Sequence, residues 1–282
     1  MPMRKIWNNQ YEQLRKIGEG ASGRVMLARD LHLNRLVAIK EMEQIREIRR
    51  EMELLKALKH PGLPDIYDYF EEDRHGFLVM EYVEGVTLKE YLEQHGKPEL
   101  TQAIVWMKEL LAILVYLHEQ HPAVVYRDLK PANLIIQEEG HLKLIDLGGA
   151  FFRCHNQSEE RVSIGTPGYS APEQWNGIQA DVSCDIFSFG AVAHELLTGV
   201  NPLKPPYERR PVRRYDRRIP VSYEQMIQKC TREHSKERYA SMREVLKALE
   251  DCETIKRRWK WKGLHLCRCL LTAIPVTMGA LL

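Results

Sequence analysis

The sequence predicts an α+β fold in two parts, a small antiparallel sheet with one helix and then a larger, mainly helical part. Short apolar runs separated by turn-forming residues fill most of the first 83 positions, which is typical of strands. After Gly85 the apolar residues recur at intervals of three and four, which is typical of helices. A chain of 282 residues with 44% hydrophobic side chains can bury the cores of two lobes that share a cleft.

The first part contains several expected strands and one expected helix. The strands occupy residues 11–17, 24–28, 36–40, 66–70 and 77–83. The helix is expected over residues 43–59, because its apolar residues fall on one stripe at helical spacing. These residues are Ile45, Ile48, Met52 and Leu55. Pro61 and Gly62 end the helix.

Polar residues mark the starts of helices in the second part. Thr87 and Glu90 have the spacing of a capping box, and Thr101 is expected to cap a long helix. The buried side of that helix carries Ile104, Leu111, Leu114 and Leu117. Helices continue to about residue 252, interrupted by a hairpin of residues 134–136 and 142–145.

The overall charge argues against a protein whose whole surface attracts nucleic acid. The chain has 41 basic and 39 acidic residues, a formal net charge of +2, so any basic surface is local. Its six cysteines are scattered, which indicates reduced thiols rather than a disulfide framework or a zinc site. Residues 1–10 lack the apolar core of a secretory signal. These observations predict a cytoplasmic protein.

Three glycines form a turn between the first two expected strands. Gly18, Gly20 and Gly23 precede Val25 in the pattern GxGxxGxV, and bare backbone at such a turn lets N–H groups close over phosphates. An ordinary glycine hairpin is the alternative interpretation. A strand rather than a helix follows the glycines, which argues against a dinucleotide site.

A lysine ends the next apolar strand, where it can reach phosphate oxygens. This is Lys40, the last residue of the sequence VAIK. Glu51 lies at the edge of the apolar stripe of the following helix, and a carboxylate there is costly unless it is paired. Lys40 is the expected partner. The alternative is that Glu51 belongs to the charged face of its helix.

The segment YRDLKPAN at residues 126–133 brings chemically useful groups close together. It places Asp128, Lys130 and Asn133 within six residues, and Asp146 follows at the far end of the expected hairpin. Transfer of a phosphoryl group requires neutralisation of its charge and a carboxylate near the attacking hydroxyl. Asn133 and Asp146 offer the oxygen ligands that Mg²⁺ prefers.

Five motifs occur in a fixed order along the chain. They are the glycine turn, VAIK at residues 37–40, YRDLKPAN, DLG at residues 146–148 and APE at residues 171–173. Over residues 11–252 the chain therefore resembles the eukaryotic-type (Hanks-type) serine/threonine protein kinase family. The resemblance implies a two-lobed protein kinase fold, with an N-lobe at residues 11–83 and a C-lobe at residues 84–252. Residues 1–10 are then an N-terminal extension and residues 253–282 a tail.

The resemblance also implies transfer of the γ-phosphate of ATP to serine or threonine hydroxyls of proteins, including the kinase itself. Asp128 would accept or orient the hydroxyl proton, supported by Lys130 and Thr166, and Lys40 would bind the α- and β-phosphates. Asn133 and Asp146 would hold Mg²⁺ or Mn²⁺. The residues implied to line the ATP site are Ile17, Gly18, Glu19, Gly20, Gly23, Val25, Ala38, Lys40, Glu51, Met80, Glu81 and Val83.

Two residues depart from the family pattern. Tyr126 stands where the family usually has histidine, and Leu147 stands where it usually has phenylalanine; the two are expected to pack near each other as a compensating pair. A pseudokinase that binds nucleotide without turnover is one alternative function. A small-molecule kinase of related fold is another, against which the segments APE and GTPGY argue.

Further positions match structural and regulatory roles in the family. Asp185 is implied to brace the catalytic loop, and Arg238 is implied to pair with Glu173. Arg127 precedes the base, which in the family allows a phosphate on the activation segment to bind the arginine. Ser158 and Ser163 lie in that segment, and Ser163 is the favoured site of autophosphorylation.

Two basic regions lie outside these motifs. The first is a loop rich in arginine, interpreted either as a solvated loop or as a docking surface for an acidic partner or an anionic lipid. Its arginines are Arg209, Arg210, Arg213, Arg214, Arg217 and Arg218. The second is basic and aromatic, at residues 256–262, and precedes a mostly apolar stretch. That order predicts a tether to the cytoplasmic face of a membrane through residues 264–282, with a terminal helix docked on the core as the alternative.

Overall fold

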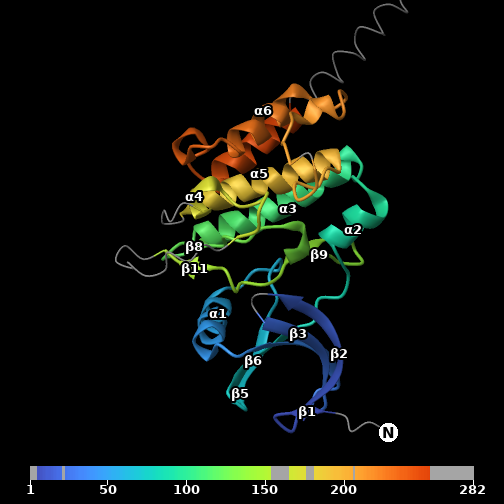
Figure 1. Cartoon of the computed structure of the whole chain (residues 1–282), viewed down its shortest axis with the longest axis vertical. Helices are drawn as coiled ribbons and strands as arrows, with labels where there is room; N and C mark the ends of the chain where they lie inside the picture. Colours follow the sequence, from blue (N-terminus) through green and yellow to red (C-terminus); the bar gives the residue numbers. More distant parts are fainter. Residues whose placement is uncertain (1–4, 21–22, 154–164, 176–180, 206, 255–282) are drawn as a thin grey trace, which may run out of the picture.

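A computed structural model of the protein describes residues 5–20, 23–153, 165–175, 181–205 and 207–254. Figure 1 shows a small lobe built on a curved sheet with one helix beside it, and a larger lobe built mainly of helices. The small lobe comes from the first part of the chain and the large lobe from the rest. This arrangement confirms the predicted α+β, two-lobed fold.

The sheet of the small lobe has the strand order β1-β2-β3-β4-β6-β5, with antiparallel neighbours. Its strands are β1 (Ile6–Trp7), β2 (Tyr11–Gly20), β3 (Gly23–Asp30), β4 (Arg35–Met42), β5 (Ile66–Glu72) and β6 (His75–Glu81). The strand β1 lies upstream of residue 11, and its Trp7 is only 1% exposed. The folded core of the small lobe therefore extends into residues 1–10.

The two faces of this sheet have different neighbours. On one face a separate apolar cluster includes Trp7, Val37 and Ile39. Residues that alternate with these, such as Ala38 and Met80, belong instead to the cluster that continues into the large lobe. Because side chains alternate along a strand, the sheet presents one closed apolar face and one face toward the rest of the molecule.

The helix α1 (Ile45–Ala57) packs against β5 and β6. It begins two residues later and ends two residues earlier than the predicted range 43–59. Its predicted stripe is present, since Ile48 and Leu55 are buried, and Leu54 extends it. Glu51 is buried on the same side, so this carboxylate requires a partner.

The start of the large lobe both confirms and corrects the predicted caps. In α2 (Leu88–His95) the capping box of Thr87 and Glu90 is present. In α3 (Leu100–His118) Thr101 is not the cap, and that prediction was wrong. The N–H of Ala103 donates to the carbonyl oxygen of Glu99 at 2.9 Å, so the first turn closes before Thr101, which lies within it.

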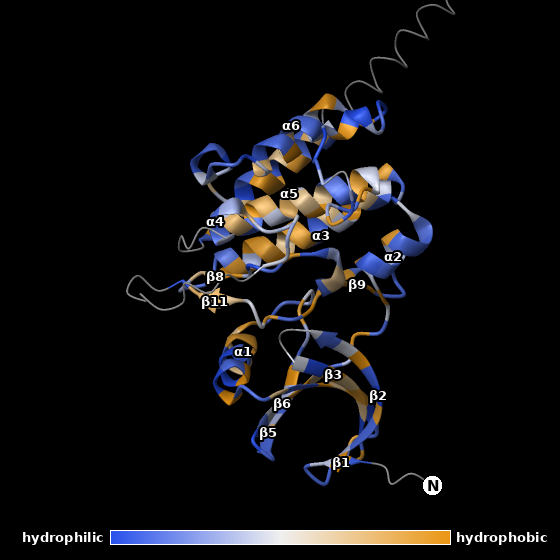
Figure 2. Ribbon diagram, in the orientation of Figure 1, coloured by the Kyte–Doolittle hydropathy of each residue, from blue (hydrophilic) through white to orange (hydrophobic). Residues whose placement is uncertain are grey.

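The core of the large lobe consists of packed helices. Its main helices are α3, α5 (Val182–Thr198), α6 (Val221–Cys230) and a helical segment at residues 242–254, with the short α4 (Pro172–Trp175). In Figure 2 hydrophobic residues are concentrated along α3 and α5. Among the described residues, α3 alone has the length and apolar composition of a membrane span, and most of it is buried in this core.

Small strands lie where the two lobes meet. They are β7 (Val86–Thr87), β8 (Val124–Val125), β9 (Leu134–Ile136), β10 (Leu142–Leu144) and β11 (Phe151–Phe152). The predicted hairpin corresponds to β9 and β10, paired from Leu134 with Leu144 to Ile136 with Leu142. Short 3-10 turns occupy Pro131–Asn133, Val212–Arg214 and Ser235–Glu237.

Most of the predicted basic patch is bonded within the protein. Arg209 donates to the carbonyl oxygen of Gly168, Arg210 pairs with Glu208, Arg213 donates to the carbonyl oxygen of Ile219, and Arg218 pairs with Asp216. Arg214 and Arg217 are exposed. The loop is thus less of an open cationic surface than its sequence indicates.

Candidate active site

A buried ion triad joins the two lobes. The Nζ atom of Lys40, on β4, lies 2.6 Å from Oε2 of Glu51 on α1 and 2.6 Å from Oδ1 of Asp146. The predicted pairing of Lys40 with Glu51 is therefore present. The contact with Asp146 joins residues 106 positions apart, and the sequence alone did not predict it.

Lys40 and Asp146 hold each other in the ionised state, whereas burial raises the pKa of the third member, Glu51. Burial by itself would lower the pKa of Lys40, but the carboxylates of Glu51 and Asp146 outweigh it and raise that pKa. Burial would likewise raise the pKa of Asp146, but Lys40 lowers it below its usual value. Near neutral pH the ammonium group of Lys40 therefore lies beside the ionised carboxylate of Asp146, a group that can ligate a metal ion.

A second cluster surrounds Asp128. Lys130 places its Nζ atom 2.6 Å from Oδ2 of Asp128 and 3.1 Å from Oγ1 of Thr166. The hydroxyl of Thr166 donates to Oδ1 of Asp128 at 2.8 Å. Asp128 remains partly exposed, so a substrate hydroxyl can approach a carboxylate that is already oriented.

Two oxygen ligands lie at the edge of these clusters. Asn133 donates its amide N–H to the backbone carbonyl oxygen of Asp128 at 2.9 Å, so its amide oxygen is the atom it can offer a cation. Asp146 accepts from Lys40 and from the N–H of Gly148 through Oδ1, and no described residue donates to its Oδ2. This set of oxygens fits Mg²⁺ or Mn²⁺.

Hydrogen bonds to α5 fix the segment that carries Asp128. Asp185, fully buried on α5, accepts the N–H groups of Tyr126 and Arg127 at 2.8 Å each. His118 also lies 2.9 Å from the same carboxylate. The expected bracing role of Asp185 agrees with this geometry. The contact between His118 and Asp185 was not predictable from the sequence.

The region between Thr166 and α4 is fixed by a buried ion pair. Arg238 donates to both carboxylate oxygens of Glu173, at 2.6 and 2.8 Å, as expected. The amide of Gln174 donates to the carbonyl oxygen of Arg127 at 2.9 Å. The catalytic segment and the segment that follows Thr166 are therefore tied together.

The predicted ATP-site residues of the sheet share one face. Strand pairing sets Val25 opposite Lys40 and Ala38 opposite Met80, and alternation puts all four on the face that continues into the large lobe. Glu81 accepts from Lys143 of β10 at 2.5 and 2.6 Å. The remaining predicted residues include Val83, which is buried, and Ile17, which is 37% exposed.

A model of the protein kinase domain matches residues 11–261 of the chain. The chain belongs to the protein kinase family. It is 34% identical to the serine/threonine-protein kinase PrkC of Bacillus subtilis over 258 residues, which are 84% of this chain and 40% of PrkC. It is 32% identical to the serine/threonine-protein kinase Aurora-2 of Arabidopsis thaliana over 215 residues, 73% of each chain. A probable serine/threonine-protein kinase PknB of Lactococcus lactis is 29% identical over 92% of this chain.

These relatives place the kinase among the Hanks-type serine/threonine kinases. The chain spans 40% of the length of PrkC and 44% of the length of PknB. More than half of each of those longer proteins therefore lies outside the match to this chain.

In this kinase the unusual Tyr126 has a specific bond. Its ring is 1% exposed, and its hydroxyl donates to the carbonyl oxygen of Ile145 at 2.7 Å. Burial, together with the nearby Asp146 and Asp128, keeps the pKa of Tyr126 well above its usual value, so the phenol stays a donor. Leu147 is buried in the same core cluster. Tyr126 thus fixes the backbone directly before Asp146.

We expect Tyr126→Phe to destabilise the kinase by about 1–2 kcal/mol, because it leaves a buried carbonyl oxygen without its donor. Urea unfolding measures this change. Tyr215→Phe is the matched control, because the hydroxyl of Tyr215 makes no hydrogen bond to the described residues, and we expect less than about 0.5 kcal/mol there. Equal losses in the two variants would show that the bond to Ile145 contributes nothing.

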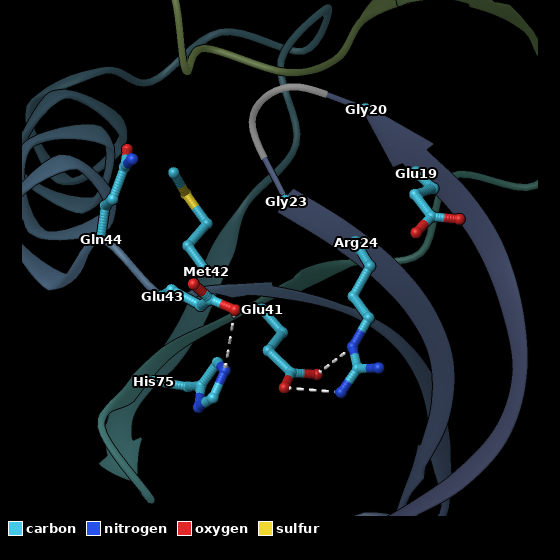
Figure 3. Close-up of a pocket in the computed structure, with 9 residues that line it drawn as sticks. All are labelled: Glu19, Gly20, Gly23, Arg24, Glu41, Met42, Glu43, Gln44 and His75. Atoms are coloured by element: carbon cyan, nitrogen blue, oxygen red, sulfur yellow. Dashed lines mark hydrogen bonds and ion pairs between the residues drawn. The ribbon is translucent and has the colours of Figure 1, made fainter.

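A cavity of about 400 Å³ lies beside the glycine turn (Figure 3). It is lined by Glu19, Gly20, Gly23, Arg24, Glu41, Met42, Glu43, Gln44 and His75. Arg24 and Glu41 form a paired contact at 2.6 and 2.7 Å, and they alternate with Val25 and Lys40 along their strands. The cavity therefore lies mainly on the opposite side of the sheet from Lys40.

Gly23 has a clear structural requirement at this turn. Its φ is +105°, and a Cβ atom there would lie 2.3 Å from the carbonyl oxygen of Glu41. A side chain would collide with backbone that cannot move without disturbing β4. Ser158, Ser163 and the predicted tether at residues 264–282 lie outside the described residues.

Proposed function

We propose that this kinase transfers the γ-phosphate of ATP to serine and threonine hydroxyls of proteins, including its own. The observation that carries the proposal is the oriented Asp128 carboxylate, bonded to both Lys130 and Thr166. A general base needs hydrogen-bond reach to the proton that it accepts, and this carboxylate is both fixed and partly exposed.

The proposed nucleotide site combines the sheet face with the ion triad. Val25, Ala38 and Met80 offer the apolar surface for the adenine ring, and the ammonium of Lys40 binds the α- and β-phosphates. Asn133 and Asp146 would hold Mg²⁺ or Mn²⁺, which supplies charge neutralisation at the phosphates when bound. The glycine turn closes over the phosphates through its backbone N–H groups.

In the proposed reaction the substrate hydroxyl oxygen bonds to the γ-phosphorus while the bond between that phosphorus and the β–γ bridging oxygen breaks. The products are a phosphoserine or phosphothreonine and ADP. Asp128 takes the proton of the hydroxyl. Lys130 neutralises charge near the γ-phosphate, and Thr166 keeps the carboxylate turned toward the substrate.

The test is phosphate transfer from labelled ATP in the presence of Mg²⁺. We expect label on a generic protein substrate and on the kinase itself, and none on small alcohols. Transfer to small alcohols instead would favour a small-molecule kinase. Nucleotide binding with no transfer to any acceptor would favour a pseudokinase and contradict the proposal.

We also propose that Ser163 accepts phosphate from the kinase itself. Arg127 is the residue that would bind this phosphate, and its guanidinium already lies in the core of the site, where Nε donates to the carbonyl oxygen of Gly149 at 2.6 Å. Mass spectrometry after incubation with ATP and Mg²⁺ tests this. Absence of phosphate between Asp146 and Glu173 would remove the proposal.

We further propose that residues 264–282 tether the kinase to a membrane. The support is the order of basic, aromatic and apolar residues in the sequence. We expect the full chain in the membrane fraction without detergent, and the double variant Leu271→Arg and Ile274→Arg in the soluble fraction, because arginine at membrane depth costs several kcal/mol. A full chain that is wholly soluble would contradict the tether.

A further inference from the structure

A second cavity lies beside the segment that carries Thr166. We define the platform loop as residues 165–170 and the platform pocket as this cavity of about 230 Å³. One wall is Gly168 of the platform loop, and the facing walls come from α5 and from the loop after it, including His194, Pro202, Lys204 and Arg209. The pocket therefore adjoins the surface on which a protein substrate would lie.

The loop after α5 packs directly on the platform loop. A Cβ atom on Gly168 would lie 2.9 Å from Cβ of Pro202. Arg209 donates from Nη2 to the carbonyl oxygen of Gly168 at 2.6 Å. A residue bound in the pocket would thus contact both the platform loop and the loop after α5.

Arg209 carries a charge that lacks a counter-ion among the described residues. Its guanidinium lies 5.1 Å from the centroid of the Phe187 ring, and that of Arg238 lies 5.0 Å from the same ring. Arg238 is neutralised by Glu173, but no described carboxylate pairs with Arg209. Burial accordingly lowers the pKa of Arg209 from its usual value. A half-buried cation of this kind favours an anionic ligand.

Lys204 adds a second positive charge to the pocket. Its side chain is exposed and forms no ion pair with any residue in the described part of the chain. Of the acidic residues nearby, Glu208 lines the pocket but pairs with Arg210 at 2.8 Å. The available charge of the pocket is therefore positive.

Glu195 of α5 does not reverse this balance. Its carboxylate is 3% exposed and accepts the hydroxyl of Tyr169 at 2.5 Å. Burial raises the pKa of Glu195 to about 7, so near neutral pH it carries only part of a charge to offset Lys204. Its Oε2 atom is bonded to Tyr169 and the side chain is buried, so the carboxylate is poorly placed to bind a basic ligand.

The pocket is close enough to Asp128 to contact the substrate near the phosphorylated residue. Thr166 bonds to Asp128 at 2.8 Å, and Gly168 is two residues further on, at most about 7 Å along the chain. An extended peptide rises about 3.3 Å per residue. A side chain within about four residues of the accepting hydroxyl can therefore reach Arg209 and Lys204.

We propose that the platform pocket is a specificity subsite that binds an acidic side chain of the substrate, through Lys204 and Arg209. The inference rests on the proposed protein kinase function and adds the class of substrate. The carboxylate of aspartate or glutamate is the expected ligand. A phosphorylated side chain offers related chemistry, and the experiment separates the two.

The test uses peptides with one serine in a neutral background, in which glutamate, glutamine, lysine or phosphoserine is placed at each of the four positions on either side. We expect glutamate to raise kcat/KM about tenfold over glutamine at one or two positions, and lysine to lower it there. Lys204→Glu should remove most of this ratio. Arg217→Glu, an equal charge change at an exposed site in the same loop outside the pocket, should leave the ratio and the basal rate unchanged.

Other outcomes would overturn the proposal. A ratio of one at every position, with phosphate still transferred to proteins, rejects the subsite but keeps the kinase function. Equal effects of Lys204→Glu and Arg217→Glu would indicate a general field rather than a pocket. A preference for phosphoserine without one for glutamate would reject the carboxylate ligand. Absence of transfer to every acceptor would reject the kinase function, and the subsite with it.

Discussion

Asp128→Asn should lower kcat for protein phosphorylation by about 10³-fold, while ATP binding changes little. The amide keeps the shape of the side chain, and its one oxygen can accept from either Lys130 or Thr166, which donate to different oxygens of Asp128. It cannot take the hydroxyl proton. General base catalysis contributes about 10²–10⁴ in rate, and the orientation of the substrate is disturbed as well. Steady-state kinetics with labelled ATP measure kcat, and calorimetry measures nucleotide affinity.

The control for this prediction is Asp73→Asn. Asp73 lies in the exposed turn between β5 and β6 with a φ of +49°, a conformation that asparagine also adopts. We expect its activity to match that of the parent chain. If Asp128→Asn and Asp73→Asn were equally active, Asp128 would not be the base.

Asp185→Asn should destabilise the kinase by about 3 kcal/mol and lower activity in the molecules that remain folded. One carboxylate oxygen accepts the N–H of Tyr126 and the other that of Arg127. An amide offers only one acceptor, so its NH₂ group must face a buried N–H, and one donor loses its partner. Loss of the buried contact between this carboxylate and Nε2 of His118 adds to the cost.

Urea unfolding of the variant measures this loss, and the same helix supplies the control. Asp181 precedes α5 and accepts the N–H of Ser183 at 2.8 Å. Asparagine caps a helix about as well as aspartate, so Asp181→Asn should change the unfolding free energy by less than about 0.5 kcal/mol. A similar small change for Asp185→Asn would contradict its bracing role.

The sequence predicted the elements whose signal is local. The stripe of α1 and the capping box of Thr87 and Glu90 depend on residues three and four apart, and both are present. The prediction for Thr101 failed because a threonine in the first turn has the same local pattern as one at the cap. The strand β1 was missed because two residues are too few to show an alternating pattern.

The candidate site was predictable in composition but not in its connections. Lys40 and Glu51 could be paired because an apolar stripe made an isolated carboxylate costly. The contacts from Asp146 to Lys40, from His118 to Asp185 and from Arg209 to Gly168 depend on tertiary packing. The many arginines near Arg209 in the sequence suggested an exposed side chain. In the structure the guanidinium of Arg209 instead packs on the ring of Phe187.

The ion triad makes one atom sensitive to the arrangement of three separate segments. Nζ of Lys40 belongs to the sheet, Glu51 to α1, and Asp146 to the large lobe. A shift of α1 or a change in the spacing of the lobes removes one of two carboxylates from this atom and alters its charge environment. Isotope labelling of the lysine side chains would therefore let a single resonance report lobe closure and helix position together, in solution and without any added probe.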